Sequence, residues 1–190
     1  MAEVKIGLAT PAGLWRMSYP ERAAFIQNAL DGHIDHIFMA DHVSFQGGHG
    51  KDGLIEVAAL SQLHPELNVM VSIYLLPLRH PMTVARQLAT LHEIAPGRIT
   101  FGVGIGGEDR HEIEVCGVDP ATRGRRMNES MDILRQLMTG DAVDYAGEFF
   151  ELNDARIKPA ISDPIPIIVG GRSNAALLRS EEHTSELQSP

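Results

Sequence analysis

An aspartate and a histidine stand next to each other at positions 41 and 42, at the end of an apolar run. A carboxylate beside an imidazole can position a ligand and move a proton near neutral pH. We therefore expect His42 to act as a general acid or base and Asp41 to orient it. The residues alone also allow the alternative of a structural pair that caps the following loop.

A glycine-rich stretch, residues 102–107, ends another apolar run and is followed by Glu108. Glycine lets the backbone approach a flat or charged ligand closely. We expect Gly104, Gly106 and Gly107 to form a shelf for a cofactor. Glu108 is expected to begin a helix whose dipole favours an anion, and to make a secondary proton or ligand contact. The stretch also matches G-x-G-x-x-G, but no second strand ending in an acidic residue follows, which disfavours a Rossmann site.

A second glycine pair, Gly170 and Gly171, ends the apolar run that begins at residue 165, and polar residues follow it. Glycine backbone at the start of a helix suits a phosphate group or a ribityl chain. We expect this pair to form a second part of the cofactor cradle. The alternative is a simple turn between a strand and a helix.

The sequence contains five short apolar runs, and the candidate residues named above lie at or beside the carboxyl ends of three of them. The runs are residues 4–11, 34–42, 68–76, 96–108 and 165–171. Between them, apolar residues recur at three- and four-residue spacing, as in helices. Strands that alternate with helices predict parallel pairing. Because a (β/α) barrel collects the carboxyl ends of its strands into one active site, we expect that architecture.

A longer interval separates the fourth and fifth runs. Within it, Met127, Met131, Leu134 and Met138 make one apolar stripe at helical spacing. The stripe predicts a helix over residues 123–140 that packs on the barrel.

The order of these features resembles the bacterial luciferase-like superfamily of flavin- and deazaflavin-dependent oxidoreductases. The resemblance covers residues 4–178. It rests on Ala-Asp-His after the second strand, on the third-strand segment and the Pro-Leu-Arg-His-Pro sequence after it, and on the Ala-Pro-Gly-Arg-Ile run that leads into the glycines. Later features fit as well: the long helix, a small hairpin at residues 144–150, and the fifth strand with its glycine pair.

The resemblance implies a (β/α)8 TIM barrel of the α/β class, with Asp41 and His42 at the reactive ring of the cofactor. It implies a non-prolyl cis peptide at Ser72 and Ile73 beneath that ring. The implied cofactor is a reduced deazaflavin of the F420 type or FMN, and the turn ending in Glu108 favours the deazaflavin. The implied reaction is hydride transfer or oxygen insertion on a small organic substrate, and a homodimer of the parent protein is compatible with it.

A complete barrel of this kind has eight strands and about 250 residues, whereas only five strands are counted here. We expect residues 1–178 to be an amino-terminal part of the barrel that is inactive by itself. Residues 179–190 read as the in-frame translation of a common sequencing adapter, and we expect them to be a disordered read-through artefact. The alternative is a native helical tail.

The composition indicates which binding partners and which cellular compartment to expect. With 16 basic and 25 acidic residues the chain has a net charge of −9, which does not attract nucleic acid or an anionic membrane. Cys116 is the one cysteine, so no intrachain disulfide forms. No apolar run approaches the roughly 20 residues of a membrane span, and no signal-peptide pattern precedes the first strand. We expect a cytoplasmic protein.

Two other functions are weighed against the oxidoreductase. One is a metal-dependent barrel hydrolase that uses Asp41, His42 and His49. A metal centre needs ligands from several strand ends, and the third to fifth runs offer none, so we expect no metal site. The other is a protein without turnover, either a non-catalytic flavin-binding relative or a fragment that does not fold.

Overall fold

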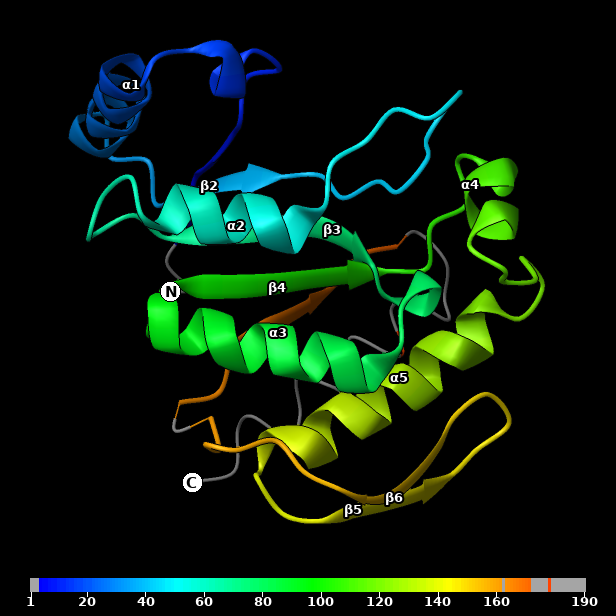
Figure 1. The fold of residues 1–190 in the computed structure, drawn as a ribbon. Helices are drawn as coiled ribbons and strands as arrows, with labels where there is room; N and C mark the ends of the chain where they lie inside the picture. The colour runs from blue at the N-terminus through cyan, green and yellow to red at the C-terminus, as the bar shows by residue number, and fades with distance from the viewer. Residues whose placement is uncertain (1–3, 162, 172–177, 179–190) are drawn as a thin grey trace.

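The computed structural model describes residues 4–161, 163–171 and 178 of the chain (Figure 1). Its centre is a five-stranded sheet in the order β1-β2-β3-β4-β7, in which every pairing is parallel. The strands are β1 (Gly7–Ala9), β2 (His36–Met39), β3 (Val69–Leu75), β4 (Ile99–Gly104) and β7 (Ile167–Val169). Each of the five apolar runs therefore contains a strand, and the α/β prediction is confirmed.

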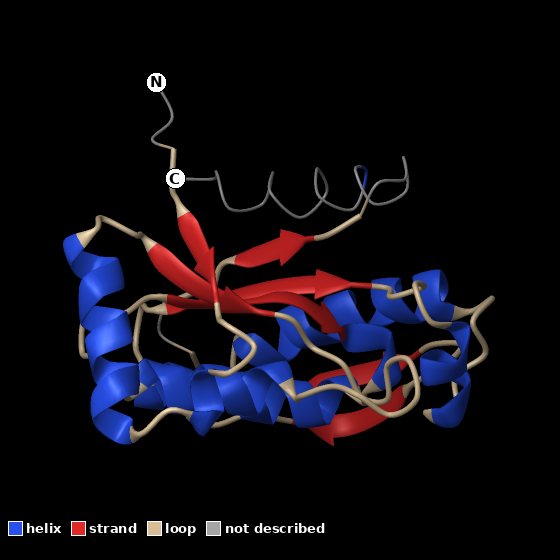
Figure 2. Cartoon of the chain, turned by 90° about the horizontal axis from the view of Figure 1, so that it is seen from above, coloured by secondary structure: helices blue, strands red, loops and turns tan. Residues whose placement is uncertain are grey.

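Helices connect the strands and gather on one side of the sheet (Figure 2). They are α1 (Tyr19–Asp31), α2 (Gly53–Ser61), α3 (Pro81–Ile94), α4 (Arg110–Val115) and α5 (Arg123–Met138), with short 3-10 turns η1 (Leu14–Arg16) and η2 (Leu76–Leu78). A doubly wound sheet would carry helices on both faces. The one-sided arrangement is that of a barrel, whose helices form an outer ring.

Local sequence signals explain where the first helices begin. Ser18 and Glu21 form a capping box before α1, with the Ser18 amide donating to Glu21 Oε2 at 2.7 Å. Asp52 caps α2, because its Oδ1 accepts from the amides of Leu54 and Ile55 at 3.0 and 3.1 Å.

Apolar side chains of neighbouring strands meet in register beneath the helices. Val69 on β3 stands opposite Ile37 on β2 and Ile99 on β4, and all three are buried. On α5 the predicted stripe is confirmed for Met127, Met131 and Leu134, which are buried, while Met138 is partly buried against the same core. Removing this apolar surface from water is the main force that holds α5 to the rest of the fold.

The structure corrects two predicted boundaries. The hairpin expected at residues 144–150 is longer, because β5 (Val143–Ala146) pairs with β6 (Glu151–Ala155) and the residues between them form its turn. Glu108 does not begin a helix: α4 starts at Arg110, with Asp109 as its cap. Residues 179–190, predicted to be an artefact, lie outside the described residues.

Candidate active site

The carboxyl ends of β2, β3, β4 and β7 line a cavity of about 580 Å³. All ten residues that the sequence nominated for the site lie on its wall, although they come from four separate strands. They are Asp41, His42, Ser72, Ile73, Gly104, Gly106, Gly107, Glu108, Gly170 and Gly171. The volume falls within the range of about 300–1,000 Å³ that is usual for small-molecule and cofactor sites.

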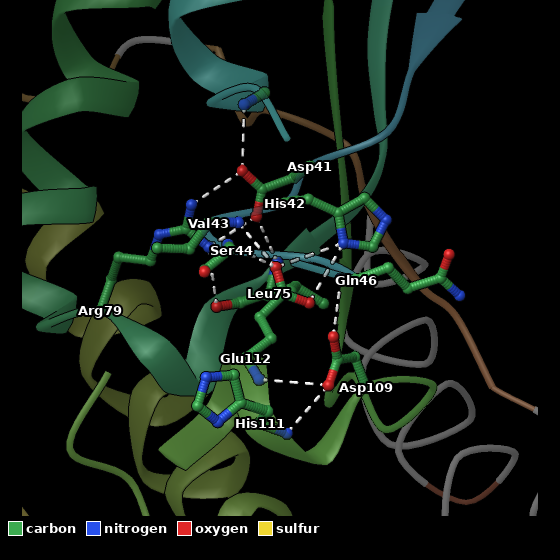
Figure 3. Close-up of polar contacts among 11 residues, drawn as sticks. Asp41, His42, Val43, Ser44, Gln46, Leu75, Arg79, Asp109, His111 and Glu112 are labelled. Atoms are coloured by element: carbon green, nitrogen blue, oxygen red, sulfur yellow. Dashed lines mark hydrogen bonds and ion pairs between the residues drawn. The ribbon is translucent and has the colours of Figure 1, made fainter. Parts of the chain in front are cut away.

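Asp41 is the centre of a buried hydrogen-bond cluster (Figure 3). Its Oδ1 accepts from the Gly53 amide at 3.0 Å and its Oδ2 from the Leu75 amide at 2.9 Å. Arg79 donates to both oxygens, at 2.8 and 2.5 Å. The carboxylate thus joins the end of β2 to the start of α2, the end of β3 and the η2–α3 turn.

Asp41 also affects the pKa of Arg79. Burial alone would lower the pKa of Arg79, but the hydrogen bonds and the negative charge of Asp41 outweigh it and raise that pKa. Tyr74 lies beneath the guanidinium, with Arg79 Cζ 4.3 Å from its ring centroid, and burial raises the pKa of the Tyr74 hydroxyl. Arg79 therefore stays positively charged beside the Asp41 carboxylate.

His42 is not oriented by Asp41, contrary to the sequence-based expectation. Its Nδ1 lies 3.1 Å from Glu112 Oε2 and 3.3 Å from Glu112 Oε1. Its ring stacks on Phe45 with 4.2 Å between the centroids. The two neighbours in sequence diverge because successive side chains of an extended segment point to opposite sides. Asp41 faces Arg79, and His42 faces α4 (Figure 3).

The acidic partner of His42 was missed by the sequence analysis. Glu112 is buried on α4 and lies 70 residues along the chain from His42. The one local signal is Asp109 followed three residues later by Glu112, which resembles a capping box. Asp109 does cap α4, yet Glu112 Oε1 turns to the loop after β2 and accepts from the amides of Val43 and Ser44 at 2.7 and 3.1 Å.

The Ser72–Ile73 peptide bond is cis, as the resemblance predicted. The register between β3 and β4 shifts between Val71 and Tyr74, so the strand bulges at this point. The bulge sets the Ile73 side chain against two glycines of the cavity wall. A Cβ on Gly104 would lie 2.6 Å from Ile73 Cγ2, and a Cβ on Gly170 would lie 2.8 Å from Ile73 Cγ1.

Glycine is also required at the rim formed by the β4–α4 turn. Gly106 and Gly107 have φ of 67° and 134°, which side chains with a Cβ rarely adopt. Glu108 follows them on the cavity wall and is exposed. Close packing behind Gly104 and Gly170 and left-handed backbone at the rim leave this part of the wall to main chain and the Ile73 side chain. Such a wall fits a flat ring system with an extended polar chain.

A second cavity, of about 490 Å³, shares Ala40, His42 and Ser72 with the first. The end of β1 and the loop after β2 complete its lining, including Lys51 and Glu56. Lys51 Nζ lies 2.9 Å from Glu56 Oε1. His42 therefore stands between two adjoining cavities.

Within residues 4–161, 163–171 and 178, no three His, Cys, Asp or Glu side chains come together as a metal would require. In the same residues, no helix has the length and apolar character needed to cross a membrane.

Comparison with known proteins identifies the family of this chain. The family model described as luciferase-like monooxygenase matches residues 4–184. The chain belongs to this luciferase-like family. The match ends inside the 179–190 segment, beyond the limit of 178 expected from the sequence.

Curated relatives of the luciferase-like chain include proteins with named activities, among them a dehydrogenase and a monooxygenase. An F420-dependent glucose-6-phosphate dehydrogenase of Nakamurella multipartita is 31% identical over 164 residues, which are 83% of this chain and 48% of the relative. A 4-hydroxyprotoasukamycin monooxygenase of Streptomyces nodosus subsp. asukaensis is 31% identical over 140 residues, 71% of this chain and 37% of the relative. The chain thus spans less than half the length of either.

A solved F420-dependent secondary alcohol dehydrogenase, in complex with an F420-acetone adduct, has the same fold. The TM-score is 0.77 at 21% identity, covering 94% of this chain and 56% of that one. The luciferase-like chain is therefore a partial barrel, as predicted.

Proposed function

We propose that the protein is a luciferase-like oxidoreductase that uses a deazaflavin of the F420 type or FMN on a small organic substrate. The observation that carries this proposal is the 580 Å³ cavity whose wall includes Ile73 on β3 and glycines at the ends of β4 and β7. Its two candidate reactions are hydride transfer and oxygen insertion. The named activities of the two curated relatives, one a dehydrogenase and one a monooxygenase, support both reactions.

The wall residues would hold the cofactor. Ile73 would support the ring system, and the glycines at 104, 106, 107, 170 and 171 would let the main chain approach the rest of the molecule. When bound, such a cofactor exchanges a hydride with the substrate or, with dioxygen, supplies an oxygen atom. The protein contributes orientation, exclusion of water and control of protons.

His42 would move the proton that accompanies either reaction. It lies on the walls of both cavities, so a substrate in the second cavity and a cofactor in the first would meet beside its ring. For an alcohol that becomes a carbonyl compound, the imidazole would accept the hydroxyl proton. Glu108, at the rim, would make a second proton or ligand contact.

Asp41 takes a different role in this proposal from the one first expected. Its carboxylate oxygens are engaged by Gly53, Leu75 and Arg79, so it would shape the cavity wall and take no part in proton transfer. The homodimer and the absence of nucleic-acid and membrane partners stay predictions from the sequence.

The test uses the intact protein, by which we mean the parent protein with the whole barrel. It is mixed anaerobically with oxidised deazaflavin in a stopped-flow instrument, with isopropanol and, separately, with glucose 6-phosphate. Loss of the oxidised cofactor's absorbance shows hydride transfer, and a parallel series with reduced FMN and dioxygen tests oxygen chemistry. At saturating cofactor, His42→Ala should lower the productive rate by about 10²–10⁴-fold. His111→Ala, which removes an exposed imidazole on α4, is the control. No reaction of either cofactor would contradict the proposal.

A further inference from the structure

We infer that Glu112 is the positioning residue of His42, which it holds with a hydrogen on Nδ1 so that Nε2 is the proton-accepting atom. This inference rests on the proposed function in one respect, which is the role of Nε2 as the atom that accepts the substrate's proton. The hydrogen-bond geometry stands independently of it.

Within the described residues, the hydrogen bonds of the Glu112 carboxylate are made to one short segment after β2. Oε1 accepts from the amides of Val43 and Ser44, and Oε2 lies 3.1 Å from His42 Nδ1. The side chain is buried, with 4% of its surface exposed. The two main-chain donors show that the Glu112 carboxylate acts as a hydrogen-bond acceptor toward this segment.

The acceptor role of Glu112 decides the tautomer of His42. A carboxylate oxygen that accepts a hydrogen bond from the imidazole requires a hydrogen on the facing Nδ1. In a neutral imidazole only one nitrogen carries a hydrogen, and Nε2 is left with its lone pair. Within the described part of the chain, Nε2 has no hydrogen-bond partner, and Figure 3 shows it turned away from Glu112.

Two more contacts keep the imidazole in this pose. Phe45 stacks on the ring at an interplanar angle of 29°. Asp109, one helical turn before Glu112, accepts from the Gln46 amide at 2.7 Å. The start of α4 therefore contacts residues 42–46 at both ends.

A purely structural role would need Glu112 only as an acceptor for Val43 and Ser44. Glu112→Gln separates the two roles, because the amide keeps one acceptor oxygen for those main-chain donors. Its NH₂ group then faces His42 Nδ1 as a donor, which requires Nδ1 to accept and moves the hydrogen to Nε2. In the serine-protease triad the corresponding carboxylate-to-amide change also produces the wrong tautomer and lowers kcat by about 10⁴-fold.

The experiment records ¹⁵N NMR spectra of the histidine rings in the intact protein, at pH values where the ring of His42 is neutral. The signal of His42 is assigned by its loss in His42→Gln. We expect a hydrogen on Nδ1 in the unmodified protein and on Nε2 in Glu112→Gln. Glu114→Gln, an exposed change on the same helix, should leave the signal unchanged.

Rates of cofactor reduction with isopropanol or glucose 6-phosphate are then measured for the same variants. With the cofactor saturating, Glu112→Gln should be slower by about 10²-fold or more, while the melting temperature and cofactor affinity change little. Glu112→Ala, which removes every contact, should lower the melting temperature as well.

Three results would overturn the inference: a hydrogen on Nε2 in the unmodified protein, an unchanged tautomer in Glu112→Gln, or a switched tautomer with an unchanged rate. If the unmodified protein neither reduces the oxidised deazaflavin nor reacts with reduced FMN and dioxygen, the proposed function fails separately. The spectra then still decide the geometric part.

Discussion

Arg79 holds Asp41 at both carboxylate oxygens, with Nη1 2.5 Å from Oδ2 and Nη2 2.8 Å from Oδ1. The Asp41 side chain is fully buried, whereas Arg79 retains 16% of its surface. A second aspartate, Asp52, lies 3.6 Å from Arg79 Nη2 and is partly exposed. The pair connects the β2–α2 and β3–α3 junctions at the cavity wall, so its integrity determines the shape of that wall.

Replacing Arg79 should destabilise the protein strongly. In Arg79→Met the buried Asp41 carboxylate loses its cation, and leaving one charge of a buried pair costs about 3–5 kcal/mol. Urea unfolding of the intact protein measures the loss. Arg110→Met removes an exposed partner of Glu114 and should cost less than about 1 kcal/mol. Equal losses in the two variants would show that the Asp41 pair does not organise the wall.

A methyl group at Gly104 should strain the cavity wall. The added Cβ would lie 2.6 Å from Ile73 Cγ2, so the Ile73 side chain has to move. Overpacking of this kind costs about 1–3 kcal/mol in unfolding free energy. Gly13→Ala is the matched control, because its Cβ would lie 3.5 Å from the nearest atom, which belongs to the flexible Arg16 side chain. A stability of Gly104→Ala equal to that of Gly13→Ala would contradict the packing described.

Acid should loosen the contact between Asp109 and the loop after β2. The hydrogen bond from the Gln46 amide is the main cause that lowers the pKa of Asp109 below its ordinary value of 3.8. A lowered pKa in the folded state means that the ionised carboxylate contributes stability above the ordinary value, which is lost as the pH falls through the folded pKa.

Hydrogen exchange at the Gln46 amide measures this effect. Protection should be present at neutral pH and decline below pH 3.8. In Asp109→Asn, which cannot ionise, the protection should be weaker and should lack this step. A step of the same size in Asp109→Asn would assign it to another group.

The 190-residue chain by itself should associate. Strands β1 and β7 lie at the two ends of the sheet order, and apolar side chains accompany both, with Ile6 56% and Ile168 46% exposed. An open strand edge is a template for pairing with another chain. Sedimentation velocity should show species larger than a monomer, and a monodisperse monomer with a cooperative melt would contradict this prediction.

The sequence predicted the strands better than the contacts between side chains. Short apolar runs ending in glycine or polar residues located all five parallel strands, because strand burial and carboxyl-end chemistry leave a local pattern. The first strand is shorter than its run, residues 4–11, since Ile6 is exposed and Gly7–Ala9 alone pairs with β2. The hairpin was predicted too short, because Gly147 signals the turn and not the full length of the strands around it.

The side-chain partners of the site residues were harder to predict from the sequence. Adjacency in sequence suggested that Asp41 orients His42, but the extended backbone separates their side chains. The real partners, Arg79 for Asp41 and Glu112 for His42, lie 38 and 70 residues away. No local spacing rule connects residues at such separations, since only the pairing of the strands and the packing of the helices bring them together.

The central claim is that the glycine-walled cavity binds a flavin-type cofactor, and equilibrium titration tests it most directly. F420-type deazaflavin and FMN are each titrated into the intact protein and followed by fluorescence, with Gly104→Ala and Gly13→Ala in parallel. We predict saturable binding of at least one cofactor at one site per chain. Gly104→Ala should weaken it by about tenfold or more, the equivalent of about 1.4 kcal/mol, while Gly13→Ala binds normally. Failure of both cofactors to bind, or equal binding by the two variants, would contradict the account.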